Sequence, residues 1–319
     1  MNRLFYRLAL FLAPLVLMLA AVEVKLSGFS NIYSRRSAAL DRVADQVQIL
    51  LVGNSHAGTG IDPRHLPTAA FSLAFPGQST IVDARLASTM FRRLPRLRLL
   101  IVGIGYGSLR YRESSIGDYG RDELFWQAFR LREDGNRFAG VLSPYRYLRF
   151  LAYRPFGPRA MLFGDSLRFA SVVSQEGWQV LDSTTRANMS WRAASAIAAS
   201  QEAALHREDI ADTMRELRAV LSQASQQRVR VVFVTPPLSF AYRAQLIDSI
   251  WDGDRSRIQA LANTCGASFR DYAADPRFGA RDFFDVEHLN ARGAKRFTRI
   301  LSDEVVGTVL AEGVGGPSC

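Results

Sequence analysis

Cysteine and histidine are scarce in this chain of 319 residues. Its two cysteines, Cys265 and Cys319, are too few for the disulfide framework that holds small secreted domains together. Four histidines, with no CxxC or HExxH spacing, offer little material for a zinc site, so we expect neither a metal nor another cofactor. We expect Cys265 to be a small buried side chain and Cys319 to lie on a mobile tail. A disulfide between the two cysteines stays open as the alternative.

Compositional extremes, internal repeats and low-complexity tracts are absent as well. Apolar residues make up 48% of the chain and charged residues 22%, which excludes wholesale disorder, collagen and coiled-coil architectures. The length is about twice the ~150 residues of a typical domain. One large α/β domain with a substantial insertion therefore fits as well as two domains.

Acidic residues are the minority among the charges. Forty Lys and Arg residues against thirty Asp and Glu residues give a formal net charge of +10, which favours anionic partners such as lipid headgroups, acidic glycans or nucleic acid. The basic residues are scattered and do not form runs. We therefore expect an ordinary basic surface and no nucleic-acid partner.

Only one long hydrophobic run occurs, and it lies at the amino terminus. Residues 8–22 are uncharged and apolar, and with residues 4–6 they approach the ~20 needed to cross a bilayer. Arg3 and Arg7 favour a cytoplasmic amino terminus, with the rest of the chain in the periplasm or outside the cell. A cleaved signal peptide and a buried soluble helix are the alternatives. Because Leu19 makes a poor cleavage site, we expect an uncleaved single-pass anchor in the inner membrane.

Apolar runs rich in β-branched residues alternate with amphipathic segments along the rest of the chain. This alternation predicts a three-layer α/β/α fold with a mostly parallel sheet, whose strand carboxyl ends share one edge where ligands bind. The predicted strands lie within 47–56, 69–77, 97–105, 229–237 and 267–272, and the predicted helices span about 80–93, 200–226, 255–263 and 291–312.

The same pattern predicts the organisation of the chain. An arginine- and aromatic-rich segment breaks the alternation and indicates an insertion, or cap, above the strand ends. The predicted parts are a membrane anchor at 1–24, a polar connector at 25–45, an α/β domain at 46–312 with the insertion at about 106–199, and a flexible tail at 313–319.

Ser55 directly follows the first predicted strand, in Gly53–Asn54–Ser55–His56. Acyl transfer by serine needs a hydroxyl exposed at a sharp turn, where backbone N–H groups can face the developing oxyanion. Taken alone, a serine at this place is also typical of a turn or a helix cap.

Near the other end of the chain, Asp285 precedes His288 by three residues. An aspartate at this spacing can orient the histidine, whose free ring nitrogen could then accept the proton of Ser55. Asp282 is an alternative orienting acid. A cluster that merely starts the last helix, with Asp285 or Asn290 as its cap and Glu287 as charge in its first turn, would give the same pattern.

These fragments together resemble the SGNH (GDSL-like) esterase and acyltransferase superfamily. Its first block is similar to residues 47–55, its second to residues 75–79 and its last to residues 285–290. The resemblance covers about 46–105 and 228–312 and leaves the insertion out.

The resemblance implies that Ser55 is the nucleophile, His288 the base and Asp285 the orienting acid. It also implies that the backbone N–H groups of Ser55 and Gly77 form the oxyanion hole. Four further residues are candidates for the pocket wall: Asn54, His56, Gln78 and Tyr106.

Two features depart from the family pattern. The third block normally brings an asparagine, but the segment 102–108 holds none, so one oxyanion donor is missing or replaced. This looks more like the membrane-anchored branch that acylates cell-envelope glycans and teichoic acids. Gly164–Asp165–Ser166–Leu167 spells the family's namesake tetrapeptide, but inside the insertion, and we treat it as a coincidence.

From these observations we expect a membrane-anchored serine ester hydrolase or O-acyltransferase that acts on acetyl groups of cell-surface polysaccharide. The resemblance also implies a possible partner, a polytopic membrane acyltransferase that supplies the acyl group. The alternative is a non-catalytic envelope assembly or polysaccharide-binding protein that retains the fold. A third interpretation is a lipid-ester hydrolase at the membrane surface.

Overall fold

The computed structural model describes residues 2–27, 31–112, 125, 128–131, 174–181, 190–203, 205, 210–311 and 319. The chain forms two compact units, Met1–Ser37 with Gly117–Ser171, and Ala38–Ile116 with Val172–Cys319. Most of the predicted insertion, with Gly164–Asp165–Ser166–Leu167, and nearly all of the predicted tail lie outside the described residues.

The first unit contains the helix α1 (Asn2–Ser27). Its segment Phe5–Lys25 has a mean hydropathy of 2.1, which makes it long and apolar enough to cross a membrane, although a signal sequence would pass the same test. Large apolar side chains are exposed around it, among them Leu10 and Phe11. A helix that is apolar on all sides is typical of a membrane span.

A second helix, α2 (Ile32–Asp41), lies within the segment predicted as a polar connector. Its start is capped by Asn31, whose side-chain oxygen accepts hydrogen bonds from the N–H groups of Tyr33 and Ser34 at 2.9 and 3.0 Å. The Tyr33 ring is buried, with its centroid 4.7 Å from that of Phe125. The polar composition concealed this helix because it depends on a cap and on tertiary burial rather than on an apolar stripe.

The second unit is built on one five-stranded sheet in the order β2-β1-β3-β4-β5, and every neighbouring pair is parallel. The predicted fold class, a parallel sheet between two layers of helices, is confirmed. The strands are β1 (Ile49–Val52), β2 (Ala70–Ser72), β3 (Leu99–Gly103), β4 (Arg230–Thr235) and β5 (Ser268–Asp271). All five predicted strands are present, each shorter than its apolar run.

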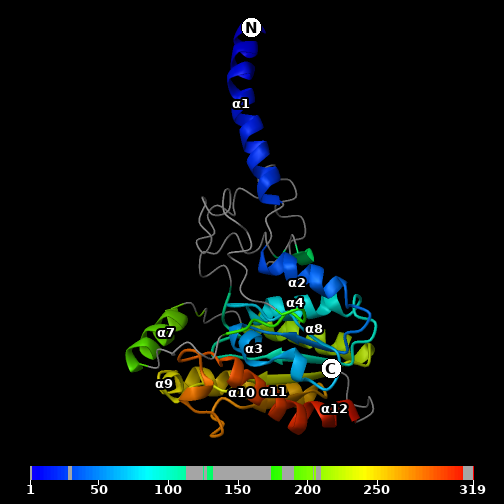
Figure 1. Cartoon of the computed structure of the whole chain (residues 1–319), viewed down its shortest axis with the longest axis vertical. Helices are drawn as coiled ribbons and strands as arrows, with labels where there is room; N and C mark the ends of the chain where they lie inside the picture. The colour runs from blue at the N-terminus through cyan, green and yellow to red at the C-terminus, as the bar shows by residue number, and fades with distance from the viewer. Residues whose placement is uncertain are drawn as a thin grey trace. The chain divides into compact units, whose positions relative to one another are not determined.

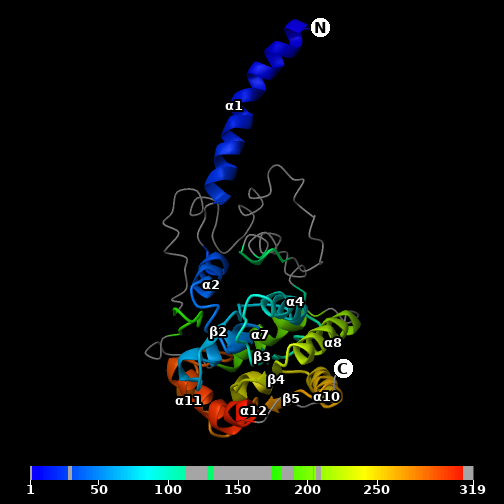
Figure 2. The same cartoon turned by 90° about the vertical axis from the view of Figure 1, so that its right-hand side faces the viewer.

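Helices cover both faces of this sheet (Figure 1). The helices α4 (Thr80–Met90) and α8 (Ile210–Gln226) lie on one face, and α11 (Ala291–Leu301) lies on the other, as Figure 2 shows. Alternate side chains of the strands, such as Ile49 and Leu51, join one buried cluster with Phe297 of α11. This period of two is what a strand buried on both faces requires.

The remaining helices differ in extent from the predicted ones. Instead of one helix over 200–226 there are two, α7 (Trp191–Ala203) and α8, and the helix predicted at 255–263 is longer, α10 (Asp248–Thr264). The last helix contains a π-helical turn, η6 (Ser302–Val306), between α11 and α12 (Gly307–Ala311). Short elements complete the described fold: α3 (Ser55–Gly60), α9 (Phe240–Arg243), η1 (Pro63–His65) and η5 (Ala280–Asp282).

The two cysteines form a disulfide bond, with their Cα atoms 4.5 Å apart. Cys265 follows the carboxyl end of α10 and is buried, as expected. The expectation of Cys319 on a mobile tail was wrong, because the bond ties this residue to the α/β unit. The alternative that the sequence left open is the one that the structure contains.

Candidate active site

Ser55 is the first residue of α3, immediately beyond the carboxyl end of β1, and it is half-buried. The turn before it depends on Gly53, which has a φ of +143°. A Cβ added there would lie 3.0 Å from both the Cβ of Ala57 and the Cα of Gly103. Only glycine fits this close approach, so the local sequence places the hydroxyl at the edge of the sheet.

The structure brings Ser55, His288 and Asp285 into one hydrogen-bonded series. Nε2 of His288 lies 2.9 Å from Oγ of Ser55, and Nδ1 of His288 lies 3.0 and 2.9 Å from the two carboxylate oxygens of Asp285. Because an ionised carboxylate only accepts hydrogen bonds, we assign the ring proton to Nδ1. The lone pair of Nε2 then faces the serine hydroxyl, which is the arrangement a general base needs.

A tight loop before α11 holds this pair in place. Oδ1 of Asp285 accepts the backbone N–H groups of Glu287 and His288 at 2.9 and 2.7 Å, and the N–H of Phe284 donates to the carbonyl oxygen of His288 at 2.8 Å. Asn290 then caps α11 by accepting the N–H of Gly293 at 3.0 Å. The short spacing between Asp285 and Asn290 thus builds a rigid turn that presents the imidazole.

The electrostatics of this turn favour a charged histidine. Burial alone would lower the pKa of His288, but its hydrogen bond to Asp285 and the charges of Glu287 and Asp285 outweigh burial and raise the pKa. Burial would raise the pKa of Asp285, but its hydrogen bond to His288 and the charge of His288 lower it. The carboxylate is therefore ionised and can stabilise the imidazolium that forms when His288 takes a proton.

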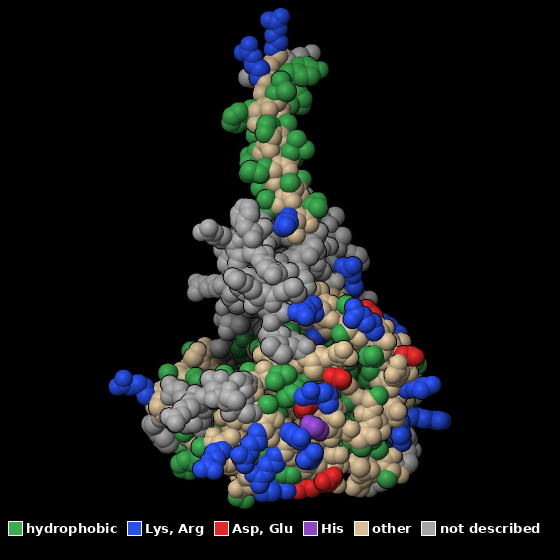
Figure 3. Space-filling view, in the orientation of Figure 1, with side chains coloured by type: hydrophobic (Ala, Val, Ile, Leu, Met, Phe, Trp, Pro, Cys, Tyr) green, Lys and Arg blue, Asp and Glu red, His purple; other side chains and the backbone are tan. Residues whose placement is uncertain are grey.

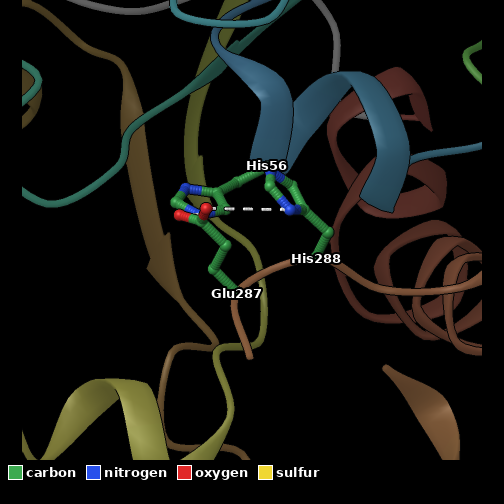
Figure 4. Close-up of side chains that lie close together, drawn as sticks. All are labelled: His56, Glu287 and His288. Carbon is green, nitrogen blue, oxygen red and sulfur yellow. Dashed lines mark ion pairs between the residues drawn. The ribbon is translucent and has the colours of Figure 1, made fainter. Parts of the chain in front are cut away.

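Glu287 occupies a place that the sequence did not indicate. It was expected among the charges of the first turn of the last helix, but α11 begins only at Ala291, after the Asn290 cap. Its carboxylate lies 3.3 Å from Nε2 of His56 and 3.9 Å from Nδ1 of His288. Figure 4 shows the three side chains close together. Burial alone would raise the pKa of Glu287, but the hydrogen bond and charge of His56 and the charge of His288 outweigh burial, so the pKa is lowered.

Among the residues that the structure describes, the same three side chains form the group that could hold a metal ion. Each of His56, Glu287 and His288 offers one ligand atom, and these atoms lie within 4.8 Å of one another. Both ring nitrogens of His288 are already engaged, by Asp285 and by Ser55. A metal ion bound here would have to displace one of these two contacts.

A partly buried series of polar contacts extends from Glu287 into α7. Nε2 of Gln201 donates to Glu287 at 2.8 Å, and the phenol of Tyr242 donates to the side-chain oxygen of Gln201. Neither Gln201 nor Tyr242 was a predicted site residue. Their sequence neighbourhoods carry no motif, and only the packing of α7 beside α9 brings them to this carboxylate.

The alternative orienting acid, Asp282, lies elsewhere. Its carboxylate accepts the N–H of Gly279 at 3.1 Å and lies 3.5 Å from Nη1 of Arg296. It forms no hydrogen bond to His288 in the described part of the chain. Of the two candidate acids, the structure therefore brings only Asp285 to the histidine.

A cavity of about 200 Å³ opens beside the serine hydroxyl. Gly77, with a φ of +62°, follows β2 and lies on its wall. All four predicted pocket residues line it, together with five residues that the sequence did not single out: Ser108, Tyr111, Ser200, Gln201 and Leu205. The full lining is Asn54, Ser55, His56, Gly77, Gln78, Tyr106 and these five. The lining combines hydroxyl, amide and aromatic groups, which suits a polar ligand.

Comparison with known proteins adds little. No family model matches this sequence, and no curated protein matches it. Among solved structures, one chain from Agrobacterium tumefaciens described as a "putative arylesterase" has a TM-score of 0.36 and 15% sequence identity over 82% of this chain and 99% of its own. At this TM-score we draw no conclusion from the likeness.

Proposed function

We propose that this protein is a serine enzyme that transfers acyl groups from esters, of the SGNH type that the sequence resembles. The observation that carries the proposal is the series from Ser55 through His288 to Asp285, with 2.9 Å between Oγ and Nε2. A nucleophile, a base and an orienting acid within hydrogen-bond reach are the parts that covalent acyl transfer requires.

In the proposed reaction, Oγ of Ser55 attacks the ester carbonyl carbon and its proton passes to Nε2 of His288. Asp285 stabilises the resulting imidazolium, and the N–H groups of Ser55 and Gly77 bind the oxyanion. The tetrahedral intermediate collapses, the alcohol leaves with the proton from His288, and the acyl group stays on Ser55. An acceptor hydroxyl then gives its proton to His288 and attacks the acyl carbon; the ester bond to Ser55 breaks, and Oγ takes the proton back from His288. With water as the acceptor the enzyme is an esterase, and with a sugar hydroxyl it is an O-acyltransferase.

We propose acetylated cell-surface polysaccharide as the substrate class. The polar and aromatic lining of the cavity suits a sugar better than a long acyl chain. The exposed face of α11 is basic, with Arg292, Lys295, Arg296 and Arg299, and Figure 3 shows Lys and Arg side chains gathered where α11 lies. Such a surface attracts an anionic glycan. A polytopic membrane partner that supplies the acetyl group is part of the same proposal.

We place this reaction outside the cytoplasm, with α1 as a single-pass anchor in the inner membrane. Two observations support this location. The segment Phe5–Lys25 has the length and composition of a membrane span, and basic residues precede it. The disulfide between Cys265 and Cys319 is of the kind that persists in oxidising compartments.

A fluorophosphonate probe tests the proposal directly. We expect the probe to label Ser55 in the full-length protein, and Ser55→Ala to abolish both labelling and hydrolysis of 4-nitrophenyl acetate. A comparison of turnover on acetylated polysaccharide and on a long-chain lipid ester then tests the substrate class. Turnover that survives Ser55→Ala would rule out the assigned nucleophile.

One observation favours a second candidate, a non-catalytic assembly or polysaccharide-binding protein. The third family block lacks its asparagine, and Gly105 follows β3 in that region. This candidate predicts that the wild type binds polysaccharide but shows no turnover that depends on Ser55. Measuring the wild type beside Ser55→Ala therefore distinguishes it from the enzyme.

A further inference from the structure

Asn54 connects the nucleophile to the neighbouring strand. It is the N-cap of α3, and its Oδ1 accepts the N–H of His56 at 3.1 Å. Because a capping amide must turn its oxygen toward that N–H, the orientation of the side chain is fixed and Nδ2 points away from the helix. In the described residues Nδ2 has no hydrogen-bond partner. Asn54 therefore has two N–H donors available to a ligand.

The space that Nδ2 occupies exists because residue 105 is glycine. Gly105 lies two residues beyond β3, and a Cβ added there would lie 2.5 Å from Nδ2 of Asn54. Any other residue at this position would push the amide away. Gly105 is not among the described residues with positive φ, so a backbone requirement does not explain the glycine. The missing side chain instead accommodates the amide.

Asn54 also lines the cavity beside the nucleophile Ser55. Asn54, Ser55 and Gly77 line the same space, and they follow the adjacent strands β1 and β2, while Gly105 follows β3 on the other side of β1. Nδ1 of His56 lies near the same point, 3.2 Å from the Cβ position of Gly105, but it is fully buried and cannot reach a ligand. Of these two groups only the amide of Asn54 is half-exposed.

We propose that Nδ2 of Asn54 is an oxyanion donor, which binds the negatively charged oxygen that forms when Ser55 attacks an ester. This assignment rests on the proposed function and adds a residue to it. The donor belongs to the residue next to the nucleophile, and the helix cap fixes its direction before substrate binds. Such a preorganised donor stabilises the transition state more than the substrate, so its removal lowers kcat and leaves KM nearly unchanged.

Asn54→Ser and Asn54→Asp test the proposal, because serine and aspartate can both cap a helix but lack the amide donor. We expect each variant to keep the melting temperature of the wild type and to lose about 100-fold in kcat for 4-nitrophenyl acetate, with KM changed by less than about threefold. Asn263→Ser, at an exposed site on α10, is the matched control and should keep full activity.

Moving the amide donor from residue 54 to residue 105, which we call the donor exchange, distinguishes the loss of a hydrogen bond from a disturbance of the structure. Gly105→Asn alone should be poorly active because its Cβ displaces Asn54, whereas in Asn54→Ser the same change places an amide in the vacated space. We expect the double variant to recover at least about tenfold in kcat over Asn54→Ser.

The proposal is overturned if the folded Asn54→Ser variant keeps a kcat within about threefold of the wild type, or if the exchange recovers nothing. Ser55→Ala measured in parallel separates this result from a failure of the proposed function. Activity that does not depend on Ser55 contradicts the enzyme mechanism as a whole. Activity that depends on Ser55 but not on Asn54 contradicts only the assigned donor.

Discussion

Nε2 of His288 lies 2.9 Å from Oγ of Ser55, although 233 residues separate the two in the sequence. Ser55 is held by the turn after β1, and His288 by the loop that leads into α11. Helices α3 and α11 pack against each other, and Leu289 and Phe297 are buried in one core cluster with residues of the sheet. The contact between the base and the nucleophile therefore follows from the packing of α3 against α11.

The two aspartates near His288 should respond differently to the same substitution. Asp285→Asn keeps the shape of the loop but removes the charge that fixes the ring proton on Nδ1, so we expect kcat to fall about 10²–10⁴-fold with little loss of stability. Asp282→Asn is the matched control. It lies against Arg296 and Gly279, and we expect it to lower the melting temperature while kcat changes little. Equal kcat losses in the two variants would contradict the assigned orienting acid.

The pH profile should show the raised pKa of His288. A protonated imidazole cannot accept the serine proton, so kcat/KM should fall as the pH drops through a midpoint above the usual histidine value of about 6.5. Glu287→Gln removes one of the charges that raise this pKa, so the midpoint should move to lower pH. Glu304→Gln changes an exposed carboxylate elsewhere and should leave the midpoint in place. A midpoint unmoved by Glu287→Gln would show that its charge does not act on His288.

Gly103 should be intolerant of a side chain. A Cβ at this position would overlap the Cβ of Ala57, which sets the position of α3 against β3. We expect Gly103→Ala to destabilise the fold by about 1–3 kcal/mol through overpacking and to lower kcat by displacing Ser55. Gly279→Ala is the control, since its φ is −124° and, apart from its chain neighbours, no described residue has an atom within 4 Å of its Cβ position. Urea unfolding and turnover of 4-nitrophenyl acetate measure both effects.

The sequence was sufficient to predict the sheet because the strands are nearly continuous apolar runs. Buried parallel strands such as β1 and β3 need no alternation of polar and apolar residues. β1 ends just before Gly53, and β3 ends at Gly103. The strand lengths were overestimated because apolar residues also fill the core beyond the hydrogen-bonded ladder. Leu73, Ala74 and Phe75 are fully buried although β2 ends at Ser72.

Only part of the candidate active site could be predicted from the sequence. The spacing of Asp285 and His288 predicts a contact that a single turn can make, and the structure contains it. The contacts of Glu287 with His56 and Gln201 depend on how α3 and α7 pack around the loop, and no local pattern in the sequence encodes that packing. Glu287 was misplaced because Asn290, three residues later, caps α11, so Glu287 is not part of the first helical turn.

The disulfide gives a test of both stability and compartment. It links residues 54 positions apart, and a cross-link of that span stabilises a fold by about 2–4 kcal/mol, chiefly by restricting the unfolded chain. We therefore expect Cys319→Ser to lower the free energy of unfolding by this amount while kcat stays near the wild-type value, because neither cysteine lines the cavity beside Ser55.

The same bond should form only where thiols are oxidised. We expect cells that express the full chain with α1 to yield the oxidised form, detected as protection from a thiol-alkylating reagent until a reductant is added. A version in which a polar sequence replaces residues 4–22 should stay in the cytoplasm and react with the reagent at once. Oxidation of both versions to the same extent would show that the bond does not report the compartment, and full reactivity of both would place the domain in a reducing one.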